Sequence, residues 1–360
     1  ANKKMIYIHI PFCISKCYYC DFYSVASHSA TEPVLKAMAR EIHERRHFLG
    51  HKASRTLYFG GGTPSILSLD QLATLLAALR EDIDLTQVEE FTMEANPEHL
   101  TADYLCGLRA LGANRLSIGI ESFIDDHLRE MNRRHSAAQA EQAVREAQKA
   151  GFDNISIDLI YGLPFMTDNQ WQDNVDQALA LGVQHISAYH LSIEERTVFH
   201  KRHMQPIAQE RSVWQYNTLC DKLRAAGFRH YEISNFALAD RLSLHNSGYW
   251  QGVPYLGIGP AAHSFDGATL RQWNVASNAL YAAGAPIEGE SLTAADCHNE
   301  YIMTRLRRDD GVNLAEYRAL FGRDFADLAP CSPIEVDDFR AWIPEREWLI
   351  ADALIAPLFI

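Results

Sequence analysis

The feature that most restricts the fold of this chain is an alternation of short apolar runs with amphipathic segments over its first half. The apolar runs are short and rich in β-branched or aromatic residues, as strands are, and lie at Met5–Ile10, Thr56–Phe59, Glu90–Glu94, Arg115–Ile120, Asn154–Leu159 and His185–Leu191. The segments between them have helical spacing and include Pro33–Phe48, Leu69–Leu79, Thr101–Leu108 and Ala137–Ala150. Strands that alternate with helices form right-handed βαβ units, so the pattern predicts an α/β fold with a parallel sheet.

Six strand–helix units are fewer than a closed eight-stranded barrel contains, and such a barrel needs about 250 residues. The pattern therefore predicts either a (βα)6 partial barrel of the TIM type or an open doubly wound sheet. In both folds ligands bind at the carboxyl ends of the strands. Helix caps are also predicted, with Thr31 and Ser68 as N-caps and Gly151 after a helix end.

The alternation of strand-like and helical segments changes after about residue 205. One more helix is predicted at Gln209–Ala226, and residues 228–285 are rich in Gly, Asn, Ser and aromatic residues, with a strand-like piece at His230–Ile233. A helical segment begins near residue 290. We therefore predict a strand–helix domain over residues 1–205, an extension over 206–285, and a mostly helical accessory domain over 286–360.

Charge and cysteine usage exclude several classes of protein. The formal net charge of −13 argues against a nucleic-acid binder, which needs a basic face. No apolar run approaches the roughly 20 residues of a membrane span, and no signal peptide precedes the first strand-like run. The seven cysteines are odd in number and unevenly spaced, which predicts a reducing, cytoplasmic location. Those outside the first cluster are predicted to be small buried hydrophobes: Cys106, Cys220, Cys297 and Cys331.

Three cysteines directly follow the first predicted strand. Cys13, Cys17 and Cys20 have the spacing C-x3-C-x2-C, so one curled loop can direct all three thiolates at a single centre. Three thiolates are one short of a closed four-cysteine site. The spacing fits a 4Fe–4S cluster with one open iron, and it also fits a zinc loop with a distant fourth ligand.

The cysteine triplet and its context resemble the radical S-adenosylmethionine (SAM) superfamily, and within it the oxygen-independent coproporphyrinogen III oxidase family. The matching motifs are YIHIPFC at Tyr7–Cys13, CDF at Cys20–Phe22, GGGTPS at Gly60–Ser65, EANP at Glu94–Pro97, RLSIGIESF at Arg115–Phe123 and IDLIYGLP at Ile157–Pro164. The resemblance implies a 4Fe–4S cluster on the three cysteines, with SAM on the open iron and an electron donor such as a flavodoxin or ferredoxin. A low-potential cluster suits the reduction of a sulfonium.

The same resemblance implies a set of SAM-binding residues. Gly61, Gly62 and Thr63 resemble the residues that hold the methionine end of SAM. Glu94 corresponds to a partner of the SAM ammonium, and Arg133 to the arginine that faces its carboxylate.

The remaining residues of the implied set are less closely matched. Asp158 is expected to meet a ribose hydroxyl or a backbone amide. Glu121 stands where relatives usually carry Gln, which adds negative charge and removes an amide donor. Tyr7 and Tyr19 resemble residues that pack on the cluster and the adenine, and Ser192 is a weaker match.

Three further features resemble the HemW branch of this family, a group of heme chaperones. Decarboxylating members carry a fourth cysteine where this chain has Phe22, and they have a longer segment before the first strand. His245–Trp250 reads HNSGYW and matches the HNxxYW pattern of the branch. His245 is then a candidate axial ligand of heme iron, with His263 as a less specific one. The alternative is a turn whose aromatic residues fill a core.

The pattern and the resemblance together predict a (βα)6 partial barrel with a mostly helical C-terminal accessory domain. They also predict a radical SAM-type heme chaperone that binds heme and delivers it to heme-accepting proteins. The first alternative is an enzyme that oxidatively decarboxylates coproporphyrinogen III to protoporphyrinogen IX. The second is a non-catalytic zinc- or cluster-binding protein. No nucleic-acid partner is expected, and a homodimer is compatible with the sequence.

Overall fold

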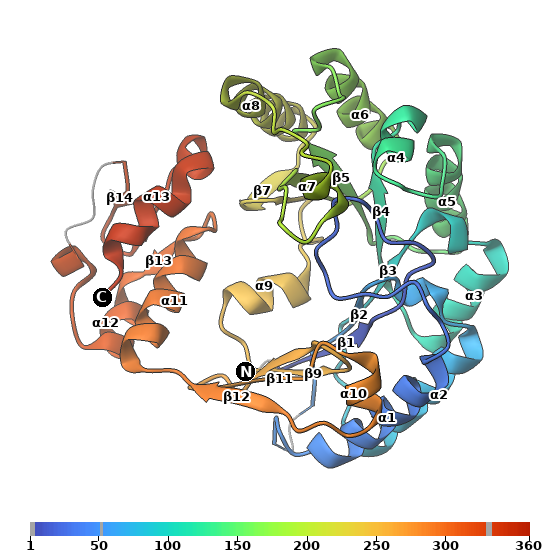
Figure 1. Ribbon diagram of the computed structural model, residues 1–360. Coiled ribbons are helices and arrows are strands. Elements are labelled where there is room, and N and C mark those ends of the chain that lie inside the picture. Colours follow the sequence, from blue (N-terminus) through green and yellow to red (C-terminus); the bar gives the residue numbers. More distant parts are fainter. Residues whose placement is uncertain (1–3, 51–52, 329–332) are drawn as a thin grey trace.

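Six parallel strands form the centre of the protein, in a computed structural model that describes residues 4–50, 53–328 and 333–360 (Figure 1). They are adjacent in chain order and pair in parallel. Their bounds are β1 (Met5–Ile10), β2 (Thr56–Gly61), β3 (Glu90–Ala95), β4 (Arg115–Glu121), β5 (Ile155–Tyr161) and β6 (His185–His190). All six lie where the apolar runs predict them, within one or two residues.

Helices cover the outer face of these strands. They are α1 (Thr31–Arg45), α2 (Leu69–Asp82), α3 (Ala102–Leu111), α4 (Asp125–Glu130), α5 (Ala137–Lys149), α6 (Asp168–Ala180) and α8 (Gln209–Ala225), whereas the short α7 (Val198–Lys201) lies next to the loop that follows β1. The predicted cap Ser68 accepts a hydrogen bond from the backbone of Gln71. The prediction that Thr31 caps α1 is wrong, because Thr31 is the first residue of that helix. Gly151 follows α5 with a φ of 88°, the left-handed backbone that favours glycine.

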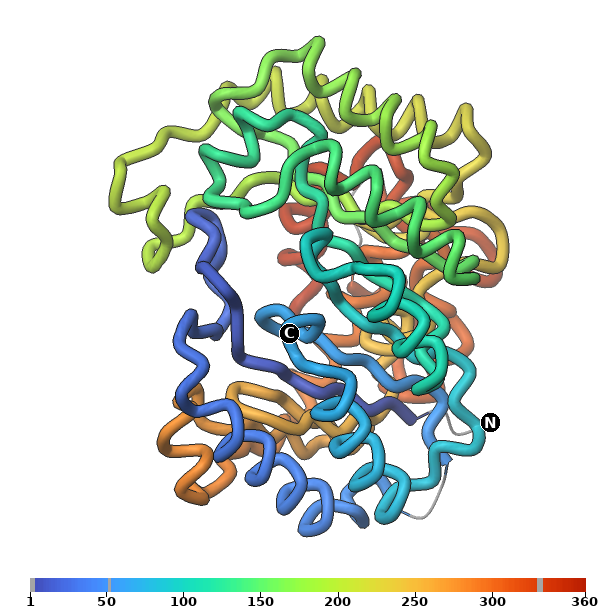
Figure 2. The backbone as a smooth tube through the Cα atoms, turned by 90° about the vertical axis from the view of Figure 1, so that its right-hand side faces the viewer, coloured from blue at the N-terminus to red at the C-terminus, as the bar shows by residue number. Residues whose placement is uncertain are grey.

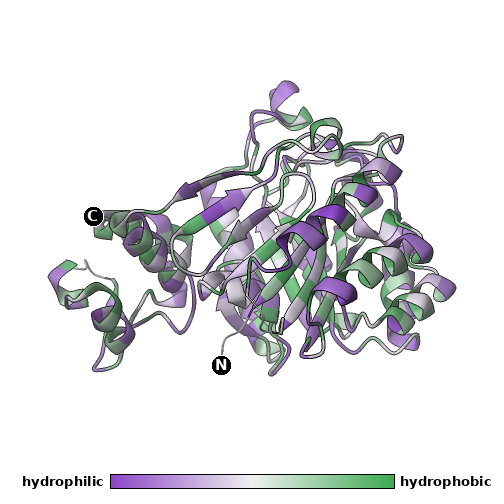
Figure 3. Ribbon diagram, turned by 90° about the horizontal axis from the view of Figure 1, so that it is seen from below, coloured by the Kyte–Doolittle hydropathy of each residue, from purple (hydrophilic) through white to green (hydrophobic). Residues whose placement is uncertain are grey.

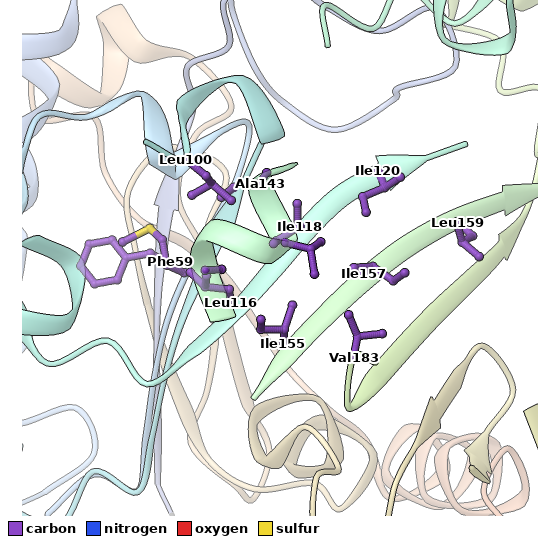
Figure 4. Packing of buried hydrophobic residues seen from close by; sticks show 14 of the residues in the cluster. Phe59, Leu100, Leu116, Ile118, Ile120, Ala143, Ile155, Ile157, Leu159 and Val183 are labelled. Atoms are coloured by element: carbon purple, nitrogen blue, oxygen red, sulfur yellow. The ribbon is translucent and has the colours of Figure 1, made fainter. Parts of the chain in front are cut away.

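The strands present different residues to their two faces, and this alternation separates core from site. On β4 and β5 the apolar residues Leu116, Ile118, Ile120, Ile155, Ile157 and Leu159 are fully buried in the main hydrophobic cluster. Figure 4 shows them with Ala143 of α5 and Leu100 nearby. Because successive side chains point to opposite faces of a strand, the residues between them point into the barrel. In Figure 3, hydrophobic stretches lie on the strands of the barrel and on the helices packed beside them, and the helices also carry hydrophilic stretches.

The sheet extends beyond the six predicted strands on both sides. Next to β1 lie β9 (Tyr255–Ile258), which is parallel to it, and then the antiparallel β10 (His263–Phe265), β11 (Leu270–Trp273) and β12 (Glu288–Ser291). Next to β6 lie the antiparallel β8 (Asn235–Ala237) and β7 (Arg229–Glu232). Two helices belong to this region, α9 (Leu244–Trp250) and α10 (Asn278–Ala282). Of these strands the sequence predicts only β7, from the strand-like piece His230–Ile233; the other short strands carry too little periodicity to be predicted.

The C-terminal segment forms a module at the side of the barrel (Figure 1). It contains α11 (Ala294–Leu306), α12 (Leu314–Phe321) and α13 (Ala351–Ile355), with a small sheet of β13 (Val312–Asn313), β14 (Glu335–Val336) and β15 (Arg340–Trp342). Short 3-10 turns are η1 (Pro64–Ile66), η2 (Pro97–His99), η3 (Phe325–Leu328), η4 (Glu345–Ile350) and η5 (Ala356–Leu358). The module has its own hydrophobic cluster. The division at residues 205 and 285 stays a prediction, and β12, beyond the second boundary, pairs with β11.

The scattered cysteines differ from one another in exposure. Cys220 is buried, as predicted. The prediction is wrong for Cys106, which is exposed, and for Cys297, which is half-buried. Cys106 follows the buried Leu105 on α3, and one helical step turns it away from the core. Cys331 lies outside the described residues. Within the described part of the chain, no helix combines the length and apolar character needed to cross a membrane.

Candidate functional site

The cysteine loop lies over the carboxyl ends of the barrel strands. It follows β1 and is fixed at its base by Cys13, whose N–H donates to the Val25 carbonyl at 3.0 Å. Farther along, the Tyr18 N–H donates to the Met131 carbonyl at 3.1 Å, and the Phe199 N–H donates to the Tyr18 carbonyl at 3.0 Å. Figure 2 shows this dark-blue segment rising from β1 toward the yellow-green segment that contains α7. The loop therefore closes the end of the barrel at which parallel strands place their ligands.

Beneath this loop lies a cavity of about 720 Å³. Most of the predicted site residues line it: Cys13, Cys17, Tyr19, Cys20, Gly61, Gly62, Thr63, Glu94, Glu121, Arg133, Asp158 and Ser192. Those from β4 and β5 belong to the inward-pointing set, together with Ser117 and Gly119. The strand alternation that buries Ile118 and Ile157 on the outside thus places Glu121 and Asp158 on the inside.

Arg133 connects the cysteine loop to the floor of the cavity. Its Nη1 lies 3.5 Å from the Cys17 Sγ and 3.7 Å from the Glu121 Oε1. Its Nη2 donates to the Asn96 Oδ1 at 2.9 Å and to the Gly119 carbonyl. Burial raises the pKa of the Cys17 thiol, and the neighbouring guanidinium opposes that effect. Arg133 is therefore held rigidly beside a thiol, with its Nε buried and unpaired in the described structure.

Glu94 is held at the end of β3 by two donors. The Tyr58 hydroxyl donates to its Oε1 at 2.7 Å, and the Gly61 N–H donates to its Oε2 at 3.1 Å. Burial raises the pKa of Glu94 to about 7, although both hydrogen bonds favour the ionised form. A cationic ligand would restore the charge of this carboxylate, so the geometry suits an ammonium group.

Two more acids face the same space. Burial, then the charges of Glu121 and Glu94, raise the pKa of Asp158 to about 8. Glu121 ends β4 in a left-handed backbone conformation with a φ of 68°, where the pairing with β5 shifts register. Three carboxyl groups on neighbouring strands make the floor acidic, which favours a positively charged ligand.

The glycine run has a steric function in this structure. A Cβ on Gly62 would lie 2.7 Å from the Phe12 carbonyl oxygen and 3.0 Å from the Cys13 Sγ, and Gly61 has a φ of 111°. The N–H groups of Gly62 and Thr63 donate to Ile10 and Phe12, both at 2.8 Å. These N–H groups are therefore not free to bind an anion. The glycines let the end of β2 pack against the cysteine loop, while the Thr63 hydroxyl donates to the Cys13 Sγ at 3.5 Å.

Tyr7 lies inside the barrel and does not line the cavity. Its hydroxyl is 3.1 Å from the His9 Nδ1, and its ring stacks on Tyr58 with centroids 6.0 Å apart. Its ring therefore supports Tyr58, whose hydroxyl donates to Glu94. That Tyr7 packs on the cluster or the adenine stays a prediction.

His245 also lies outside the cavity, and the structure does not present it as a heme ligand. Its Nδ1 is 2.7 Å from the Thr56 Oγ1, and its Nε2 is 3.0 Å from the Tyr249 hydroxyl. The side chain is fully buried, and burial lowers its pKa to about 3. Its backbone N–H donates to the Glu90 Oε1 at 2.9 Å. Thr56 and Glu90 begin β2 and β3, so α9 packs at the amino end of the barrel, opposite the cysteine loop.

His263, the second heme candidate, is exposed on β10 and stacks on Trp273 with centroids 5.8 Å apart. It does not line the cavity either.

The sequence interpretation missed three residues that shape the site. Tyr58 and Asn96 position Glu94 and Arg133, and Tyr189 lines the cavity from β6 with 44% of its side chain exposed. Asn96 stands within the EANP motif, immediately after a strand. Its position at a strand end is the pattern from which it was predictable.

The three loop cysteines are spread more widely than the ligands of a single zinc ion. Zinc holds thiolates at about 2.3 Å, so its ligands lie within about 4.6 Å of one another. Cys13, Cys17 and Cys20 do not form such a group. In the described part of the chain, the one group of three His, Cys, Asp or Glu ligand atoms that all lie within 4.8 Å is elsewhere.

Comparison with known proteins agrees with this geometry. The model of the radical SAM superfamily matches residues 7–178. The E. coli coproporphyrinogen III oxidase HemN, described as a radical SAM enzyme, superposes with a TM-score of 0.84 over 99% of this chain and 90% of its own. At 22% identity this likeness concerns the fold alone, and it confirms the predicted α/β partial barrel. The fold and the family match over residues 7–178 are those of a radical SAM protein, a class that carries a 4Fe–4S cluster and SAM.

Relatives with higher sequence identity show to which family within this class the chain belongs. The heme chaperone HemW of Lactococcus lactis is 36% identical over 330 residues, covering 89% of this chain and 86% of its own. HemW of Bacillus subtilis is 35% identical over 342 residues, covering 91% of this chain and 89% of its own. HemW of E. coli is 32% identical over 325 residues, covering 88% of this chain and 86% of its own. The chain belongs to the HemW family.

Proposed function

We propose that this protein is a cytoplasmic heme chaperone, which binds heme and delivers it to heme-accepting proteins while carrying a 4Fe–4S cluster and SAM. The observation that carries the proposal is the cavity itself. It brings three thiols, an acidic floor and one rigid arginine together in a chain whose relatives, over most of its length, are heme chaperones.

In this proposal Cys13, Cys17 and Cys20 bind three irons of the cluster. The Thr63 hydroxyl and the Arg133 guanidinium each lie 3.5 Å from a cysteine sulfur. Hydrogen bonds to cluster sulfurs tune its reduction potential. A flavodoxin- or ferredoxin-type protein is the proposed electron donor, and a homodimer is the proposed assembly. A reduced cluster held by these cysteines would supply an electron to the sulfonium of SAM.

The remaining cavity residues are proposed to hold SAM. Glu94 binds its ammonium group, and Arg133 binds its carboxylate. The other contacts are divided between the methionine end, the ribose and the adenine, and come from Gly61, Gly62, Thr63, Glu121, Asp158, Tyr19 and Ser192.

For heme, the cavity mouth offers an apolar surface that α9 does not. Phe22, which replaces the fourth cysteine of the decarboxylating relatives, lines the cavity with 72% of its side chain exposed. Tyr189 lines the same cavity. Aromatic rings of this kind pack on a porphyrin face.

Anaerobic reconstitution followed by two parallel assays tests the proposal. We expect spectroscopically defined heme binding, transfer of heme to an apo-acceptor, and no protoporphyrinogen from coproporphyrinogen III. Phe22→Ser should weaken heme binding while the iron content stays that of the parent chain, and Phe339→Ser, which removes an equally exposed ring in the C-terminal module, serves as the control. SAM-dependent decarboxylation, or a chain that binds no heme, overturns the proposal.

A further inference from the structure

A second group of metal-ligating side chains lies where the barrel edge meets the C-terminal module. Cys220 comes from α8, His230 from β7 and Glu345 from η4. The Cys220 Sγ, a ring nitrogen of His230 and a carboxylate oxygen of Glu345 all lie within 4.8 Å of one another. The His230 Nδ1 is 2.8 Å from the Glu345 Oε1 and 3.8 Å from the Cys220 Sγ. The cysteine loop and its cavity do not include this group.

The hydrogen bonds of His230 define which of its atoms faces the other two side chains. Its Nε2 lies 3.2 Å from the Ile233 carbonyl, which accepts only from an N–H. In the neutral ring the Nδ1 is then a lone-pair acceptor, and it faces the Glu345 carboxylate oxygen, which also accepts, and the Cys220 sulfur, whose thiol donates only weakly. Either a proton on the Nδ1 or a metal ion is therefore needed between the Nδ1 and the carboxylate oxygen, which lie 2.8 Å apart. This donor pattern, with the second ring nitrogen fixed by a backbone carbonyl, is that of metal-binding histidines.

Glu345 also has an outer hydrogen-bond partner that fixes the orientation of its side chain. Its Oε2 accepts a hydrogen bond from the Arg224 Nη2 at 2.8 Å, which leaves the Oε1 directed at His230. Carboxylates that ligate metals commonly have such an outer partner. The His230 ring is also clamped by packing, since it stacks on Phe236 at 3.9 Å and meets the edge of Trp348 at 4.4 Å.

We propose that Cys220, His230 and Glu345 form a divalent-metal site that takes zinc. Thiolate, imidazole and carboxylate together select a borderline-soft ion over Mg²⁺ or Ca²⁺. Three protein ligands leave the fourth tetrahedral position to a water or an anion. A cavity of about 370 Å³ borders the group, and Arg229 and Arg340 are part of its lining. The ion links α8, β7 and η4, and so fastens the C-terminal module to the edge of the barrel sheet.

Zinc stoichiometry tests this site in the cluster-reconstituted chain, whose loop thiols are occupied. After removal of loose metal with a weak chelator, we expect one zinc per chain. Cys220→Ser and Glu345→Gln should each raise the zinc dissociation constant at least tenfold. The matched controls are Cys297→Ser and Glu347→Gln, a cysteine and an acid outside the group, which should retain the parent affinity.

Cobalt identifies the thiolate ligand independently. In a chain with Cys13, Cys17 and Cys20 all changed to Ser, one equivalent of Co²⁺ should give a thiolate-to-metal charge-transfer band that Cys220→Ser removes. If Cys220→Ser does not fold, Glu345→Gln decides, because that side chain is one-third exposed. Absence of retained zinc in the parent chain, or equal retention in Glu345→Gln and Glu347→Gln, overturns the site.

Discussion

The guanidinium of Arg133 lies 3.5 Å from the thiol of Cys17, so a single side chain joins the cysteine loop to the acidic floor of the cavity. The same arginine faces Glu121 and is fixed by Asn96. A charge in this position acts on both parts of the site. It offsets the charge of a thiolate, and it is available to an anionic group of the proposed SAM ligand.

Removal of one loop thiol should abolish the cluster. The reconstituted parent chain should contain about four irons and show an EPR signal of the reduced cluster that SAM perturbs. Cys17→Ala should lose both, because two thiolates do not retain the cluster. Iron analysis and EPR measure this, with Cys106→Ala, which changes an exposed cysteine of α3, as the control. A full cluster in Cys17→Ala contradicts the ligand assignment.

Loss of either charged partner should weaken SAM binding. Arg133→Ala and Glu94→Ala should each reduce the binding free energy by about 1–3 kcal/mol, since each removes a charge-assisted contact. Equilibrium binding to the reconstituted chain measures the effect, and the iron content should be unchanged. Arg134→Ala is the matched control, because Arg134 is the exposed neighbour of Arg133 in sequence. Parent affinity in both site variants means that SAM is held elsewhere.

SAM affinity should rise with pH in a way that depends on Glu94. Burial raises the pKa of this group to about 7, so below that pH an ammonium ligand must first displace a proton. We expect the dissociation constant to increase by up to about tenfold per pH unit below 7, and this slope to be absent in Glu94→Gln. Glu130→Gln, a change on the exposed surface of α4, should keep it.

The same shift makes a prediction for the stability of the SAM-free chain, with the opposite sign. The folded-state pKa of about 7 exceeds the ordinary value of 4.5, so the folded state holds its proton more tightly than the unfolded state. This contribution to stability is complete below pH 4.5 and is lost as the pH rises through 7. The free energy of unfolding, measured with denaturant, should decrease less between pH 5 and pH 8 for Glu94→Gln than for the parent chain.

Truncation of His245 should affect folding and leave heme binding unchanged. His245→Ala removes a buried ring that bonds to Thr56 and Tyr249, and we expect a loss of about 2–4 kcal/mol in unfolding free energy. The heme absorption spectrum should match that of the parent chain. His263→Ala, which truncates an exposed histidine, should change neither the stability nor the spectrum. A shifted heme spectrum for His245→Ala at parent stability contradicts the structural role.

The sequence by itself determined the six parallel strands and the end of the sheet at which the site lies. Strand β1 has the predicted bounds Met5–Ile10, because a buried strand is encoded by its own apolar residues. Glu94, Glu121 and Asp158 were identifiable through the family motifs that contain them, and each lies at or near the carboxyl end of a predicted strand, where parallel folds place their ligands. Apolar runs and motifs are local in the sequence, so they can be recognised without knowledge of the tertiary structure.

Only the tertiary structure decided what depends on distant partners. The HNSGYW motif alone does not reveal that His245 bonds to Thr56, which lies 189 residues away, and is therefore buried at the amino end of the barrel. His230 and Glu345 are 115 residues apart and converge with Cys220 only because the C-terminal module packs beside β7. Strands β9–β12 are likewise set by pairing with β1 and with one another, since runs of three or four residues have no periodicity of their own. Exposure and hydrogen-bond partners are properties of the packed chain, whereas hydrophobic period and motif order are properties of the sequence.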